Sequence, residues 1–283
     1  MKQAKFSTTK FLIITMLLSV CCALGAYKEA YAANVRIHRP KVRLSIASGS
    51  SESGTITIAN PADKPATVKA YLEDWVYAET QDGIKNFSPP GSTPLSCAPW
   101  ISFYPAEFTL PAFGSQDVFF VVKVPEGVSG GHYAVLFFET AIGAMQNQEG
   151  VNILVKGRLG SLFYIEAGDA QREARLTDVS VTKSDAGLSI AALLENIGNV
   201  DITAKGSFNI IDAQGMVFAR GRFNDVYTFP GDKGTLSSVW VEDVPPGSYD
   251  VIITLDLGEK PLIHESSIAI DSSGSVRYGT TGQ

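Results

Sequence analysis

The sequence predicts an all-β protein built of two antiparallel β-sandwiches in tandem, and three observations lead to this fold class. Apolar and polar residues alternate in many short runs, which is the pattern of strands with one buried face. Turns rich in proline and glycine separate these runs, and no long window carries apolar residues at helical spacing. The apolar density falls over residues 166–170, and a second series of runs follows.

The chain begins with a segment typical of a secretory signal peptide. Three lysines precede an apolar run over residues 11–26, and Ala-Tyr-Ala at 30–32 supplies the small residues of a cleavage site. This run is shorter than the roughly 20 residues that a membrane-spanning helix needs. We therefore expect residues 1–32 to be removed, leaving no membrane span. The segment therefore predicts an exported protein.

Charge and cysteine content narrow the classes of partner. The net charge is −6, and removal of the lysine-rich leader makes the mature chain more acidic. An acidic chain is a poor partner for nucleic acid or for an anionic membrane surface. Of the three cysteines only Cys97 lies in the mature part, so no intramolecular disulfide is expected. Stability must then come from buried apolar area.

The first series of runs has the length and spacing of an immunoglobulin-like sandwich. Its expected strands are Thr55–Ala59, Thr67–Trp75, Val118–Val124, Tyr133–Thr140 and Val151–Val155. We assign them to a first domain over residues 33–166. Within it, residues 98–124 are expected to form a strand, a corner and a second strand of one sheet, with Pro105 and Pro111 at edge or turn positions. Phe119 and Val121 are expected in the core.

The second series predicts another sandwich of immunoglobulin-like type over residues 167–271. Its expected strands are Leu188–Leu194, Ala204–Ile211, Val217–Phe223, Gly234–Val241 and Tyr249–Leu257. The remaining residues 272–283 show no apolar pattern, and we expect a disordered tail.

No motif in the sequence indicates catalysis. Residues 127–131 match the nucleophile motif G-x-S-x-G by letter, but they connect two apolar runs, whereas that motif needs a strand that turns into a helix. The three histidines are far apart, and one mature cysteine cannot form a paired metal motif. No base neighbours Cys97 in the sequence, so a passive thiol is expected. We expect no enzyme activity, catalytic residue, metal or cofactor.

The order of features in the first domain resembles a known family. These features are Thr55–Asn60, Tyr71–Trp75, Ile101–Pro111, Val118–Val124, Tyr133–Glu139 and Asn152–Tyr164. They resemble the N-terminal domain of the periplasmic pilus assembly chaperones, the PapD-like family, over roughly residues 40–166. The most specific part is the last, where an apolar alternating run leads into Leu-Phe-Tyr at 162–164. The second domain is similar only as another immunoglobulin-like sandwich.

The resemblance implies a location in the periplasm, with the cell surface as the alternative. It also implies strand donation to a protein subunit of a pilus or other surface structure, with an outer-membrane usher as a further candidate partner. In the family, the last strand of the first domain supplies the strand that an incomplete subunit lacks. Val151, Ile153 and Val155 have the required period of two and form the expected subunit-binding strand. The alternative is that these three side chains point into the domain's own core.

The family also implies an anchor for the carboxylate at the subunit's C-terminus. An arginine on the first strand and a lysine just before Leu-Phe-Tyr form that anchor, and Arg43 is the candidate for the arginine. Ser161 stands where the lysine is expected. Arg158 or Lys156 can replace the lysine only if the neighbouring glycines allow a bulge that redirects one of them.

A second class of function explains the missing lysine. In it, the protein is a structural or adhesive envelope protein of two immunoglobulin-like modules without chaperone activity, and the strand at Val151–Val155 is internal. An enzyme or a carbohydrate-binding domain is the remaining class, because a fold alone does not determine function.

Overall fold

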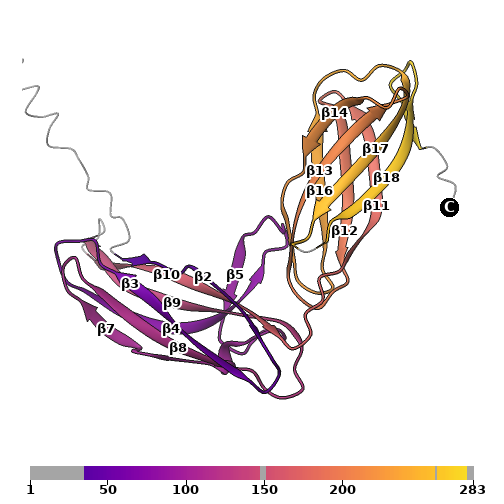
Figure 1. Ribbon diagram of the computed structural model, residues 1–283. Helices are drawn as coiled ribbons and strands as arrows, with labels where there is room; N and C mark the ends of the chain where they lie inside the picture. Colours follow the sequence, from indigo (N-terminus) through magenta and orange to yellow (C-terminus); the bar gives the residue numbers. More distant parts are fainter. Residues whose placement is uncertain (1–34, 147–150, 259, 279–283) are drawn as a thin grey trace, which may run out of the picture.

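The computed structural model describes residues 35–146, 151–258 and 260–278, which form two β-sandwich domains set at an angle to each other (Figure 1). The predicted signal peptide, residues 1–32, lies outside the described residues. Within the described part, the helical structure is one 3₁₀ turn, η1 (Ala98–Trp100), and no helix is long and apolar enough to cross a membrane.

The first domain packs two sheets face to face. The smaller sheet has the order β1-β3-β8-β6, with β1 (Arg36–Ile37), β3 (Ser51–Ala59), β8 (Ser115–Lys123) and β6 (Ile101–Tyr104). The larger sheet has the order β2-β10-β9-β4-β5, with β2 (Lys41–Ile46), β10 (Asn152–Ala167), β9 (Gly130–Gln146), β4 (Ala66–Tyr77) and β5 (Lys85–Ser88). β7 (Glu107–Leu110) also pairs with β4.

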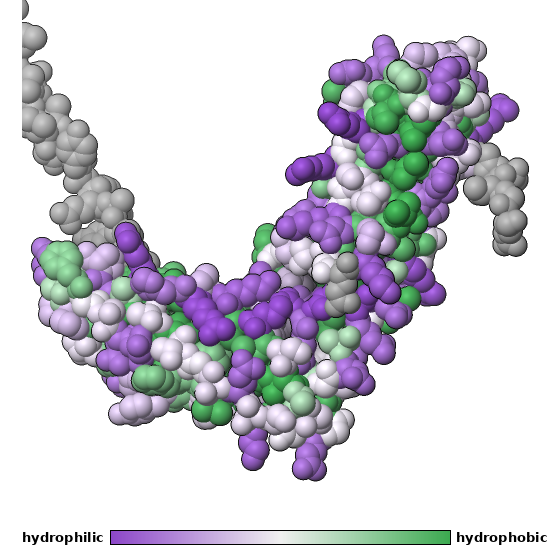
Figure 2. Space-filling model, in the orientation of Figure 1, coloured by the Kyte–Doolittle hydropathy of each residue, from purple (hydrophilic) through white to green (hydrophobic). Residues whose placement is uncertain are grey.

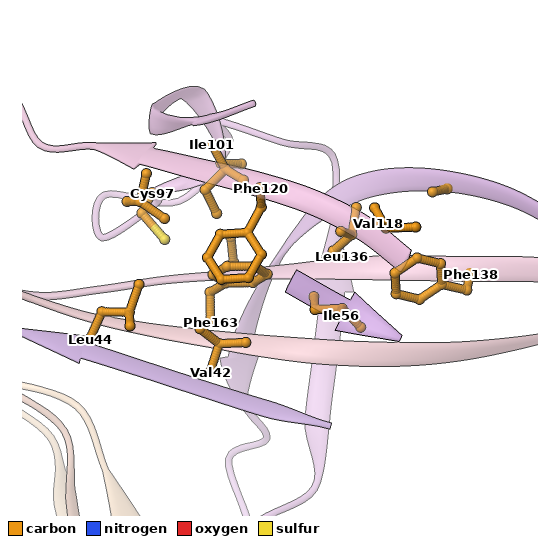
Figure 3. Packing of buried hydrophobic residues seen from close by; sticks show 14 of the residues in the cluster. Val42, Leu44, Ile56, Cys97, Ile101, Val118, Phe120, Leu136, Phe138 and Phe163 are labelled. Atoms are coloured by element: carbon orange, nitrogen blue, oxygen red, sulfur yellow. The ribbon is translucent and has the colours of Figure 1, made fainter. Parts of the chain in front are cut away.

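Buried aromatic and aliphatic side chains fill the space between these sheets. Figure 3 shows Phe120 of β8 facing Phe163 of β10, and their ring centres lie 5.0 Å apart. Burial of one such side chain stabilises the fold by roughly 1.5–3 kcal/mol. Cys97 is fully buried in the same core, and burial, together with the charge of Asp74, raises the pKa of its thiol. This environment suits a passive thiol.

The expected strand, corner and second strand of one sheet are present over 98–124, since β6 pairs with β8. The segment differs from the expectation in two ways. Between these strands, β7 pairs with β4 of the other sheet, so the chain crosses between the sheets at Pro105. The side chains of Phe119 and Val121 are 58% and 42% exposed, so their assignment to the core is wrong. On a strand only alternate residues face inward, and the inward set of β8 is Val118, Phe120 and Val122.

The second domain also packs two sheets around an apolar core. One sheet has the order β11-β12-β16, with β11 (Ala174–Ser184), β12 (Gly187–Asn196) and β16 (Lys233–Trp240). The other has the order β14-β13-β17-β18-β19, with β14 (Val217–Arg222), β13 (Ile202–Asp212), β17 (Gly247–Asp256), β18 (Leu262–Ile270) and β19 (Val276–Tyr278), and β15 (Val226–Thr228) pairs with β13.

The prediction of a disordered tail from residue 272 is wrong for β19. Val276 pairs with Ile270, and the Tyr278 hydroxyl accepts a hydrogen bond from the main-chain N–H of Val181. The Asp271 carboxylate accepts a main-chain hydrogen bond from Ser273 at 2.9 Å and holds the turn before the strand. A three-residue strand is too short to show a period in the sequence, and the edge of β18 stabilises it. Residues 279–283 lie outside the described residues.

Candidate functional site: the free edge of β10 and the cleft between the domains

β10 carries an unpaired edge along more than half of its length. β2 runs parallel to β10 but pairs with it only from Leu162 to Ala167, and no other strand of the described chain pairs with this side. The Leu162 N–H donates to the Pro40 carbonyl at 2.9 Å. Because main-chain groups alternate between the two sides of a strand, the even-numbered residues from Asn152 to Gly160 direct their N–H and C=O groups at the free edge.

The alternation of β10 is not interrupted along this edge. The register with β9 shifts between Val155, which pairs with Gly143, and Lys156, which pairs with Ala141. The extra residue is therefore Ile142 of β9, and β10 itself stays regular.

The three residues predicted to bind a subunit lie at the free end of this strand. Val151, directly before β10, and Ile153 are 54% and 43% exposed, and Val155 is half-buried. By alternation, Ile153 and Val155 share a face with Phe163, which lies in the core of the domain. These apolar side chains therefore extend the inward face of β10 beyond the packed core of the domain. Val151 and Ile153 are exposed and so do not lie in the core, which was the alternative. Their role in binding a subunit stays a prediction.

Arg43 on β2 lies in the cleft where the two domains meet. Its guanidinium donates to both carboxylate oxygens of Asp201, at 3.1 and 2.8 Å, and to Glu166, which also binds Arg172. Burial lowers the pKa of Arg43, but the hydrogen bonds and charges of Asp201 and Glu166 outweigh it, and the net shift is upward. Arg43 thus already binds two carboxylates, one from each domain.

Arg158 and Lys156 lie outside the cleft. Each forms an ion pair on the outer face of the larger sheet, Arg158 with Glu73 at 2.8 Å and Lys156 with Glu139 at 2.7 Å. Because β10 is regular here, neither side chain is redirected to the face of Ser161. Ser161 is buried, and its hydroxyl donates to the Arg39 carbonyl at 2.6 Å.

Lys41 is the cleft residue that the sequence reasoning missed. Its ammonium lies 4.2 Å from the centre of the Tyr164 ring, and no described carboxylate is within ion-pair distance of it. Burial and then the charge of Arg43 lower its pKa. A signal was present in the sequence, since Lys41 precedes Arg43 by two residues and so shares its strand face.

The cleft is a polar hollow of about 440 Å³. It is lined by Lys41, Arg43, Glu166, Arg172, Asp201, Thr203, Leu257 and Gly258. Three cations and two carboxylates leave an excess of positive charge in a chain that is acidic overall. Figure 2 shows hydrophilic residues along the concave side of the bend between the domains. The arrangement suits a bound anion.

Aromatic side chains fix the two domains against each other beside this cleft. Phe229 of the second domain stacks on Tyr133 with ring centres 4.3 Å apart and packs at 5.3 Å from Trp75. The Gly131 N–H donates to the Asn199 carbonyl at 2.7 Å. The glycine-rich loop at 127–131 therefore connects β8 with β9 and allows the second domain to approach closely.

No residue set of the described chain suggests a metal centre, since no group of three or more His, Cys, Asp or Glu side chains gathers there.

The chain matches no protein-family model and no curated protein. Among solved structures it is similar to the class 5 fimbriae chaperone CfaA, with 15% identity over 82% of this chain and 98% of that chain and a TM-score of 0.47. It is also similar to a chain of the complex between the SafA pilin and the SafB chaperone of Salmonella enterica, with 11% identity, coverages of 82% and 96% and a TM-score of 0.42.

A third similar structure is the CsuC–CsuE complex of a chaperone and a tip adhesion subunit from archaic chaperone–usher Csu pili of Acinetobacter baumannii, with 11% identity, coverages of 82% and 98% and a TM-score of 0.41. At these levels of identity the likeness concerns the fold.

Proposed function

We propose that the protein is a periplasmic chaperone that binds a subunit of a pilus or other surface structure by strand addition at the free edge of β10. The observation that carries this proposal is an unpaired strand edge with exposed apolar side chains at alternate positions. Free main-chain groups supply affinity in strand addition, and the alternate side chains fill a groove of the partner. A pilin binds SafB and a tip adhesion subunit binds CsuC, and we propose a partner of that kind.

We propose that the added strand runs parallel to β10, as β2 does. β2 runs parallel to β10, and its first residue, Lys41, pairs with Leu162. A subunit segment that runs parallel to β10 alongside residues 152–161 therefore ends at Lys41. Its terminal carboxylate meets an ammonium group that has no carboxylate partner among the described residues. We propose that Lys41 binds the terminal carboxylate directly. Arg43 then stabilises the cleft by binding Glu166 and Asp201.

The other predicted anchors lie away from Lys41, toward the free end of β10. Arg158 and Lys156, the other predicted anchors, lie on the same strand face as Tyr164, but Arg158 is six residues, or about 20 Å, away along the strand. The proposed location in the periplasm and an outer-membrane usher as a second partner rest on the signal peptide pattern and on the family resemblance.

Co-expression with a subunit tests the proposal. The chain is expressed with a candidate pilin-like subunit, and the complex is isolated from the periplasm. Ile153→Asp places a charge among these apolar side chains of β10 and is expected to abolish the complex, because a carboxylate in a closed apolar groove is strongly disfavoured.

The matched control is Val121→Asp on β8, since Val121 is an aliphatic strand residue of the same domain and is 42% exposed. This variant is expected to retain the complex. A complex that survives Ile153→Asp unchanged contradicts strand addition through this face and favours the alternative of a structural or adhesive envelope protein.

A further inference from the structure

The second domain carries another free strand edge, far from β10. β14 is the first strand in its sheet order and pairs only with β13 among the described strands. The Phe223 N–H donates to the Gly206 carbonyl at 2.9 Å, so by alternation the main-chain groups of Arg222 and Arg220 point away from β13. Figure 1 places β14 in the part of the second domain that is remote from the first domain.

Two arginines stand side by side along this edge. Arg220 lies opposite Asn209 and Arg222 opposite Ser207, both are exposed, and no described carboxylate is within ion-pair distance of either. They line a hollow of about 440 Å³ in which all charged groups are cationic. In an acidic chain, two unpaired cations on one strand face form a local positive site.

A hollow of mixed polar and apolar lining adjoins the arginines at one end. It has a volume of about 450 Å³ and is lined by Asn209, Val217, Phe218, Ala219, Arg220 and Trp240. Val217 and Phe218 are the exposed apolar side chains of this hollow. At the other end, Arg222 adjoins Lys205 with Asp225 and Asp256, where the charges balance.

We propose that the β14 edge binds an extended acidic segment of a partner protein as an added strand. Side chains on one face of a strand repeat every two residues, about 7 Å, so acidic residues at alternate positions match Arg220 and Arg222. An apolar residue that follows them packs against Val217 and Phe218 in the adjoining hollow. The two arginines favour a negatively charged ligand. The free main-chain N–H and C=O groups favour a peptide segment over a compact anion, because only a peptide backbone can pair with them.

Calorimetric titration of the full mature chain with synthetic peptides tests this inference. The probe is a blocked peptide of sequence TETETLT, and its control is TEETTLT, which has the same composition with adjacent glutamates. We expect TETETLT to bind at least about fivefold more tightly, because only its glutamates reach both arginines from one strand face.

Two double variants locate the site. The double variant Arg220→Gln with Arg222→Gln is expected to weaken binding of TETETLT about tenfold. The control pair Lys64→Gln with Lys123→Gln removes the same charge from exposed positions of the first domain and leaves binding unchanged.

Three results overturn the inference: equal affinity for the two peptides, an equal loss in the control pair, or tight binding of inorganic polyphosphate that the peptide cannot displace. The last result indicates a general anion site.

Discussion

Replacement of Arg43 by methionine tests how the two domains are held. Methionine keeps an unbranched apolar stem but leaves the carboxylate of Asp201, which is almost fully buried, without its two guanidinium hydrogen bonds of 3.1 and 2.8 Å. A hydrogen bond to a charged group contributes about 1.5–3 kcal/mol, and loss of one partner of a buried pair costs about 3–5 kcal/mol. Since the Arg43 side chain is partly exposed, water compensates in part, and we expect a loss of about 2–3 kcal/mol.

The assay is urea unfolding followed by tryptophan emission, which includes Trp75 at the domain contact. Asp201→Asn in the Arg43→Met background removes the stranded charge, so the double variant is expected to recover to within about 1 kcal/mol of the unsubstituted protein. Losses that simply add in the double variant refute the reasoning, because they show that the two side chains do not stabilise the fold through each other.

Three further outcomes follow from individual sites. Gly130→Ala is expected to lower the melting temperature more than Gly127→Ala. Both glycines have positive φ, so both substitutions strain the backbone, but only a Cβ at Gly130 meets a neighbour, the Asn199 carbonyl at 2.6 Å, whereas at Gly127 nothing lies within 4 Å. Burial and the charge of Arg43 lower the pKa of Lys41, so its ammonium loses its proton at a lower pH than that of an exposed lysine. Affinity for a subunit should therefore fall as the pH rises through this lowered pKa, and Lys41→Arg should abolish this dependence in a binding titration. Cys97 should react with iodoacetamide only after unfolding, and rapid alkylation of the native protein contradicts its burial.

Strand content followed from the sequence because a half-buried strand alternates apolar and polar residues. The same alternation identified Ile153 and Val155 as one face, and it also showed that Lys41 and Arg43 share a face, although the sequence reasoning did not use it. Period alone does not say which face is inward. Phe119 and Val121 were assigned to the core for that reason, although the outer face of β8 carries them.

Contacts between distant parts of the chain had no sequence signal. Arg43 meets Asp201 across 158 positions, so neither residue indicates the other in the sequence. The free edge of β10 likewise depends on where β2 stops pairing, at Leu162, which no local pattern encodes. The short strand β19 forms only because β18 offers it an edge.

Amide hydrogen exchange along β10 measures strand addition most directly. In the free protein, the N–H groups of Leu154, Lys156 and Arg158 point to the unpaired edge and should exchange fast, while those of Val155 and Leu159 point toward β9 and should be protected. On binding of a subunit, we expect the three even-numbered amides to become protected and the odd-numbered ones to stay as they were. A stable complex in which these three amides still exchange fast contradicts strand addition at β10.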